Sequence, residues 1–128
     1  MITLKPRHDF DVGSIINMNT VEERTWYVYL LEDPREDYPF YIGTTCNPIQ
    51  RLRSHVSEAR NTPADRRSDK QLKIMSIVDV NFSPQLKIVG VYEDEALAIR
   101  DELLLISSYT GLTNIKRPHR ANNKRVTQ

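Results

Sequence analysis

The sequence predicts a small α/β sandwich in which helices flank a mainly antiparallel sheet of three strands. Two observations predict this class. Three runs rich in β-branched and aromatic residues are bounded by turn-forming residues, and apolar residues recur at helical spacing between and after these runs. The expected order is strand, strand, helix, helix, strand, helix, and 128 residues are few enough to form one domain.

The first two strands are expected at residues 25–32 and 40–42. The first run reads TWYVYLLE, and the second reads Phe-Tyr-Ile. The polar turn that begins at Asp33-Pro34 separates them. This spacing predicts an antiparallel pair joined by a short loop.

The first helix is expected to begin at Asn47-Pro48, which supplies a capping side chain followed by proline at the first helical position. Apolar residues then recur at helical spacing up to the polar stretch at residue 61, and they are predicted to form its buried stripe: Ile49, Leu52, Val56 and Ala59. The helix should therefore be about fourteen residues long.

A second helix is expected to start near Ser68 or Asp69, with its apolar side formed by Leu72, Met75, Ile77 and Val78. Pro84 precedes the third strand, which is expected at residues 85–92. The acidic residues 93–95 favour the start of the last helix, which is predicted to run to Tyr109 and to end with Gly111 as its C-cap.

The predicted organisation has three parts. Residues 1–24 form an N-terminal extension without a clean period, residues 25–115 form the folded domain, and residues 116–128 form a basic tail. One cysteine, Cys46, excludes an internal disulfide and a zinc site of several thiolates. No apolar stretch approaches the length of a membrane span, so an intracellular, cytoplasmic protein without a membrane partner is expected.

The charge is segregated although the net charge is only +1. Residues 51–73 carry seven basic and three acidic side chains, and residues 116–128 carry five basic and none acidic. These stretches either form a positive face that attracts phosphate or merely solvate a helix and a terminus. The candidates for nucleic-acid binding are Arg53, Arg60, Arg66, Arg67, Lys70, Lys116, Arg117 and Arg120.

Polar residues on two of the predicted helices favour chemistry. Arg51 and His55 stand one turn apart on one flank of the predicted buried stripe, close enough to reach a common phosphate. Glu102 points with the apolar side of the last helix, where a carboxylate needs an ion-pair partner, a proton or a bound cation. A buried salt bridge from Glu102 to Arg51 or to a lysine is the structural alternative.

These pieces together resemble the GIY-YIG nuclease family. The resemblance is carried by Tyr27-Val28-Tyr29, then Tyr41-Ile42-Gly43, then Arg51 and His55, then Glu102 and a downstream Asn114. It covers about residues 25–115. Tyr27 stands where the first motif of the family has glycine.

The resemblance implies metal-dependent hydrolysis of DNA, with Mg²⁺ or Mn²⁺ as the cofactor and RNA as the alternative substrate. It places Tyr29 and Tyr41 in the active site, one as general base for water and the other as a positioning group. Arg51 would neutralise the scissile phosphate, and Glu102 would hold the cation. His55 and Asn114 complete the implied catalytic set, and Gly43 would let the backbone pass where a side chain would collide.

The alternatives remain open at this point. Tyr27, Tyr29 and Tyr41 could simply pack in the strands, since tyrosine is a preferred strand residue. The chain could also be an inactive nucleic-acid-binding or partner-binding module on the same fold. Target recognition would come from residues 1–24, residues 60–70, the basic tail, a second copy of the chain or a partner protein.

Overall fold

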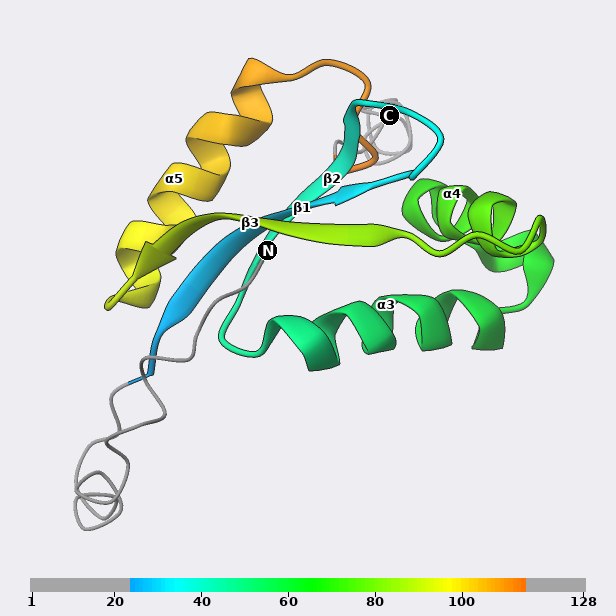
Figure 1. Cartoon of the computed structure of the whole chain (residues 1–128), viewed down its shortest axis with the longest axis horizontal. Helices are drawn as coiled ribbons and strands as arrows, with labels where there is room; N and C mark the ends of the chain where they lie inside the picture. Colours follow the sequence, from blue (N-terminus) through cyan, green and yellow to red (C-terminus); the bar gives the residue numbers. More distant parts are fainter. Residues whose placement is uncertain (1–23, 115–128) are drawn as a thin grey trace, which may run out of the picture.

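The computed structural model describes residues 24–114, so residues 1–23 and 115–128 lie outside the described part. Three strands form one antiparallel sheet in the order β2-β1-β3, with bounds β1 Trp26–Glu32, β2 Pro39–Thr45 and β3 Gln85–Tyr92 (Figure 1). The predicted fold class and element order are confirmed.

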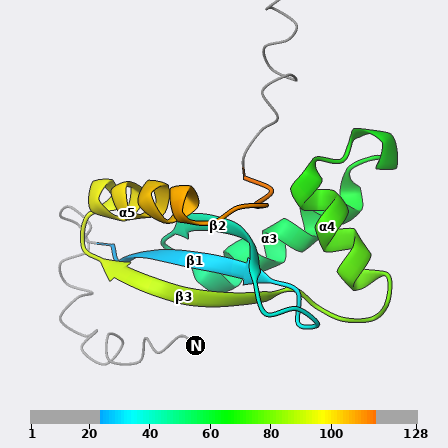
Figure 2. The same cartoon turned by 90° about the horizontal axis from the view of Figure 1, so that it is seen from above.

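Helices cover both faces of the sheet (Figures 1 and 2). The helices α3 (Pro48–Asn61) and α4 (Asp69–Val78) pack on the face that carries Tyr29 and Leu31, and a short 3₁₀ helix at Ala64–Arg66 connects them. The helix α5 (Glu95–Ser108) packs on the opposite face against Val28 and Leu30. Alternate residues of β1 therefore contribute to two separate cores.

The starts of α3 and α4 follow from their caps, as the sequence predicts. The Asn47 side chain accepts a hydrogen bond from the Gln50 amide, and Pro48 occupies the first helical position. Ser68 and Gln71 form a reciprocal capping box at the start of α4.

The predicted end of α5 is wrong. The helix ends at Ser108 with extended Tyr109 as its C-cap, whereas Gly111 lies beyond it with φ of +78°. The reason is a tertiary contact of Tyr38 in the β1–β2 loop. Its hydroxyl donates to the Thr110 carbonyl and accepts from the Thr110 amide, and its ring packs edge-on against Tyr109. These contacts hold the chain in an extended path before the glycine is reached.

The buried side of α3 also differs from the prediction. His55 is fully buried, whereas Ile49 is 60% exposed. The side of α3 that carries His55 and Ala59 faces the core, so the buried side of the helix is rotated toward His55 relative to the predicted one. One further apolar residue that was expected inside, Leu72 on α4, is also exposed.

The free edge of β2 is covered by the segment that follows α5. Thr113 donates to the Phe40 carbonyl through both its amide and its hydroxyl. The Asn114 side chain accepts from the Ile42 amide and donates to the Ile42 carbonyl. This pairing satisfies backbone groups that an edge strand leaves open. Among the helices between residues 24 and 114, none has the length and hydropathy to cross a membrane.

Candidate active site

Tyr29 and His55 form the centre of a buried polar cluster between the sheet and α3. The Tyr29 hydroxyl lies 2.7 Å from His55 Nε2. Both side chains are almost completely buried. Burying a hydroxyl or an imidazole costs free energy unless the group is hydrogen-bonded. Here the Tyr29 hydroxyl and His55 Nε2 are hydrogen-bonded to each other.

Gly43 makes room for this pair. It lies opposite Tyr29 in the antiparallel ladder, and a Cβ added to Gly43 would come within 2.5 Å of the Tyr29 hydroxyl. Any side chain at residue 43 would therefore displace the phenol. Glycine is required here because it leaves space for the Tyr29 hydroxyl, and not because the backbone turns.

Tyr41 and Lys70 extend the cluster toward the edge strand β2. The Tyr41 ring packs edge-on against His55 with 5.2 Å between ring centroids, and it lies 6.2 Å from the Tyr29 ring. Lys70 Nζ of α4 lies 4.7 Å from the centre of the Tyr41 ring, within the range of a cation–π contact. The sequence predicts Lys70 only as a surface cation, because nothing in its local pattern indicates that α4 turns it toward Tyr41.

Arg51 acts electrostatically on both phenols. Burial is the largest influence on the Tyr29 hydroxyl and raises its pKa above the ordinary value, and the Arg51 guanidinium opposes this rise through a side-chain hydrogen bond and its charge. Burial likewise raises the pKa of Tyr41, again against the positive charge of Arg51. Arg51 therefore lies where it would stabilise a phenolate at either tyrosine.

His55 is neutral in this environment. Burial, followed by the positive charges of Lys70 and Arg51, lowers the pKa of His55 to about 3. Its Nδ1 is buried without a hydrogen-bond partner among the described residues. An orphaned lone pair costs less than an orphaned N–H, so this environment favours the tautomer in which Nε2 carries the hydrogen and donates to the Tyr29 oxygen.

Glu102 reaches the same region from the other face of the sheet. Its carboxylate accepts a hydrogen bond of 2.7 Å from Thr44 Oγ1, one residue beyond Gly43 on β2. Its negative charge contributes to raising the pKa of both Tyr29 and Tyr41, which places it near the two phenols. Within residues 24–114 Glu102 forms no ion pair, so the alternative of a salt bridge to Arg51 or a lysine has no support there. Thr44 was not predicted, although strand alternation places it on the α5 face with Ile42.

Asn114 contacts backbone rather than the cluster. Both polar atoms of its amide are engaged by Ile42, the residue next to Tyr41. Asn114 is thus hydrogen-bonded to the backbone of β2, the strand that carries Tyr41 and Gly43.

A divalent cation would find one protein carboxylate here. The described residues contain no group of three or more His, Cys, Asp or Glu side chains suited to a metal. Glu102 has no cationic partner in that part of the chain, which suits a magnesium ion held by one carboxylate, substrate phosphate oxygens and water. This single carboxylate therefore fits a cation whose coordination is completed by the substrate and water.

The remaining basic residues divide into paired and unpaired groups. Arg35, Lys73, Lys87 and Arg100 each lie within 4.0 Å of a carboxylate. The predicted binding residue Arg67 instead donates to the carbonyls of Ala59 and Thr62. Side chains without an ion pair in the described chain lie on α3, the 3₁₀ helix and α4: Arg51, Arg53, Arg60, Arg66 and Lys70. Lys116, Arg117 and Arg120 lie outside the described residues.

The comparisons with known proteins identify the family of the chain. A model of the GIY-YIG catalytic domain matches residues 25–111. The chain belongs to the GIY-YIG family. The matched range contains the cluster, Gly43 and Glu102, and it ends before Asn114. Neither the curated proteins nor the solved structures gave a match.

Proposed function

We propose that this GIY-YIG chain is a divalent-metal-dependent endonuclease that hydrolyses phosphodiester bonds of DNA. The observation that carries the proposal is the cluster of buried Tyr29 and His55 with half-buried Tyr41. It is flanked by Glu102 and by two cations, Arg51 and Lys70, that form no ion pair within residues 24–114. A phosphodiester would supply the missing negative charge, and the tyrosines would lie beside it.

Tyr29 is the proposed general base. Its oxygen accepts from His55 Nε2 in the favoured tautomer, and this hydrogen bond stabilises the phenolate that must form. The Tyr29 phenol first loses its proton to solvent. The phenolate then takes a proton from the attacking water and becomes phenol again as the new P–O bond forms and the P–O bond to the leaving oxygen breaks. Burial opposes phenolate formation, so the positive charge of Arg51 is needed to offset it. Tyr41 positions the water or a phosphate oxygen.

Arg51 and Lys70 are the proposed phosphate-binding pair. Negative charge grows on the nonbridging and leaving oxygens during in-line displacement, so fixed cations stabilise the transition state more than the ground state. Lys70 lies in the cluster with its amino group over Tyr41, and burial followed by the charge of Arg51 lowers its pKa. An anion placed between the two cations would relieve their mutual repulsion.

Glu102 is the proposed ligand of Mg²⁺ or Mn²⁺. When bound, this cation would neutralise charge at the leaving oxygen. Thr44 would orient the Glu102 carboxylate through its hydroxyl, and Asn114 would hold β2 in place beneath Tyr41. Both are positioning residues in this account.

A plasmid-nicking assay with and without Mg²⁺ tests the proposal. Nicking of supercoiled DNA in Mg²⁺ that stops in EDTA supports the endonuclease. Binding without nicking under either condition supports the alternative, an inactive binding module on the same fold. Cleavage of RNA but not DNA would correct the substrate.

A further inference from the structure

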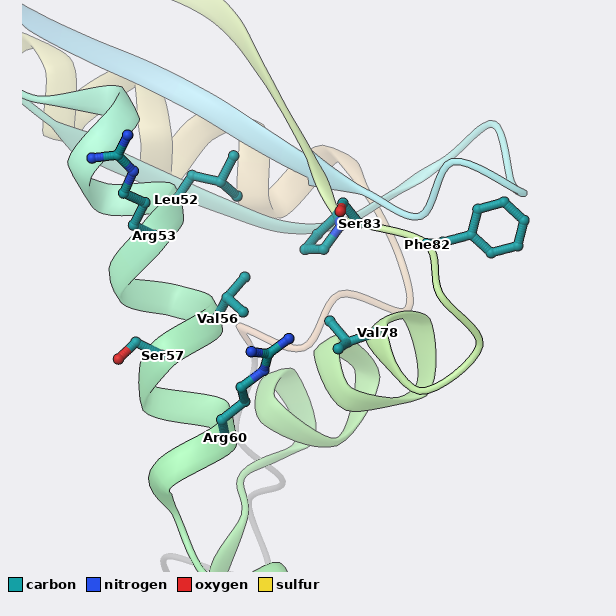
Figure 3. A pocket seen from close by; sticks show the side chains of 9 residues that line it. Leu52, Arg53, Val56, Ser57, Arg60, Val78, Phe82 and Ser83 are labelled. Carbon is teal, nitrogen blue, oxygen red and sulfur yellow. The ribbon is translucent and has the colours of Figure 1, made fainter.

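A pocket lies on the flank of α3 that faces away from Arg51. Its volume is about 410 Å³, and it is lined by α3, the end of α4 and the connection that leads into β3 (Figure 3). Leu52, Val56, Val78 and Pro84 provide its apolar lining, and Arg53 and Arg60 lie at its rim. We call this cavity the α3 flank pocket.

The two arginines make the rim of the pocket positively charged. Neither Arg53 nor Arg60 has an ion-pair partner in the described part of the chain, although four other cations there do. They are seven residues apart, which separates their positions by about 10 Å along the helix axis. An apolar floor between two guanidinium groups fits a molecule with a flat apolar part and flanking anionic groups.

The pocket and the active site occupy opposite flanks of one helix. With 100° per residue, Arg51 and His55 lie on one side of α3, and Arg53 and Arg60 lie about 180–200° from Arg51. A helix with its side chains is about 10–12 Å across. A strand held at Arg51 would therefore cross the exposed side of α3 within about three or four nucleotides, because successive nucleotides of a stacked strand lie about 3.4 Å apart.

We propose that the α3 flank pocket takes an unpaired base of the cleaved strand, with the adjacent phosphates at Arg53 and Arg60. A base can reach an apolar floor only when it leaves the duplex stack, whereas paired DNA would present phosphates alone to the rim. The volume lies within the range of small-molecule pockets. The inference rests on the proposed function for the path of the strand, and it assigns a preference for substrates with unpaired nucleotides.

The test measures binding in EDTA, so that it does not depend on turnover. Fluorescence anisotropy compares two DNA duplexes of equal length, one fully paired and one with three unpaired nucleotides in one strand. The wild-type protein should bind the second duplex about tenfold more tightly. Val56→Trp fills the pocket and should remove this preference, whereas Leu104→Trp on the exposed side of α5 should keep it.

Charge variants provide a second measurement that leaves the apolar packing intact. Arg60→Gln at the rim should reduce the preference at least threefold, and Arg100→Gln on α5 should not change it. Circular dichroism checks the fold of each variant. An equal affinity of the wild type for both duplexes, or a full preference in both Val56→Trp and Arg60→Gln, would overturn the pocket assignment. A protein that shows the preference but never nicks DNA would retain the pocket and lose the proposed catalysis.

Discussion

The two faces of the sheet bury different kinds of side chain. On the α5 face, Val28, Leu30, Ile42, Ala98 and Leu112 form an apolar core. On the α3 face, the same strands bury a phenol, an imidazole and part of a lysine next to their apolar neighbours. Burying polar groups costs free energy that an apolar core avoids. The α5 face therefore contributes mainly stability, and the proposed function accounts for the polar groups that the other face buries.

The two faces meet at Gly43 and Thr44. Gly43 lies beneath the Tyr29 phenol, and the next residue, Thr44, bonds Glu102 of α5. A carboxylate on one face can thus act beside tyrosines of the other because both are anchored at this point of the edge strand. The comparison predicts that substitutions on the α3 face and at Glu102 impair cleavage, and that those in the α5 core impair stability alone.

Tyr29→Phe should produce the largest effect on the α3 face. It removes the proposed base while keeping the ring, so nicking should fall about 10²–10⁴-fold, the usual contribution of a general base. Single-turnover nicking rates measure this loss. Tyr27→Phe, two residues earlier on β1, is the matched control and should stay within a few fold. Equal losses in the two variants would assign the effect to strand packing.

Arg51→Lys should lower the nicking rate about a hundredfold or more. Lysine keeps one positive charge but lacks the planar fork that engages two phosphate oxygens. The rate at saturating DNA should fall much more than the affinity, because the lost contact belongs to the transition state. Full activity in this variant would shift the phosphate role to Lys70 or Arg53.

His55 should make stability depend on pH. Burial, followed by the positive charges of Lys70 and Arg51, lowers its pKa to about 3 in the folded protein, against an ordinary value near 6.5. The phenols of Tyr29 and Tyr41 also face the ring. The unfolded chain therefore binds the extra proton between these values. Stability should be fully present above pH 6.5 and should fall toward pH 3, by up to about 4 kcal/mol from this group.

Chemical denaturation of the wild type and His55→Gln at several pH values measures this contribution. The variant keeps a hydrogen-bonding side chain but cannot titrate, so its free energy of unfolding should change less over the same interval. Contributions from carboxylates cancel in the difference between the two proteins. Parallel pH profiles would contradict a neutral, buried His55.

Ile42→Val in the α5 core should produce the smallest effect. Ile42 is fully buried, and loss of one methylene should lower the free energy of unfolding by about 0.5–1.5 kcal/mol. The nicking rate should stay within about twofold when folding is complete. A large loss of nicking activity from this conservative change would contradict the expectation that the α5 core affects stability alone.

The sequence predicts the elements well because their signals are local. Asn47 and Ser68 act as caps as predicted, and the third strand occupies the predicted residues. The errors concern tertiary contacts. Gly111 is not the C-cap of α5, because the Tyr38 hydroxyl is hydrogen-bonded to the Thr110 backbone. His55 lies at the centre of the buried side of α3 and not at its edge, because the helix is rotated about its axis.

The sequence indicates which residues lie close together better than it indicates their contacts. The resemblance implies that Tyr29, Tyr41, Arg51, His55 and Glu102 share one region, and the structure brings them near one another. Helical periodicity indicates that Glu102 needs a partner, but it cannot identify Thr44 across the sheet. The approach of Lys70 to Tyr41 depends on how α4 crosses β2, which no local pattern encodes.

Glu102→Gln most directly tests whether the two faces act together on a phosphodiester. The substitution keeps the size of the side chain and its bond from Thr44 but removes the charge proposed to hold the cation. Nicking of supercoiled plasmid is measured for the wild type, Glu102→Gln and the neighbouring Asp101→Asn, each in Mg²⁺ and in EDTA. The account predicts nicking by the wild type and Asp101→Asn in Mg²⁺ alone, and none by a folded, DNA-binding Glu102→Gln. Wild-type nicking by Glu102→Gln in Mg²⁺ would contradict it.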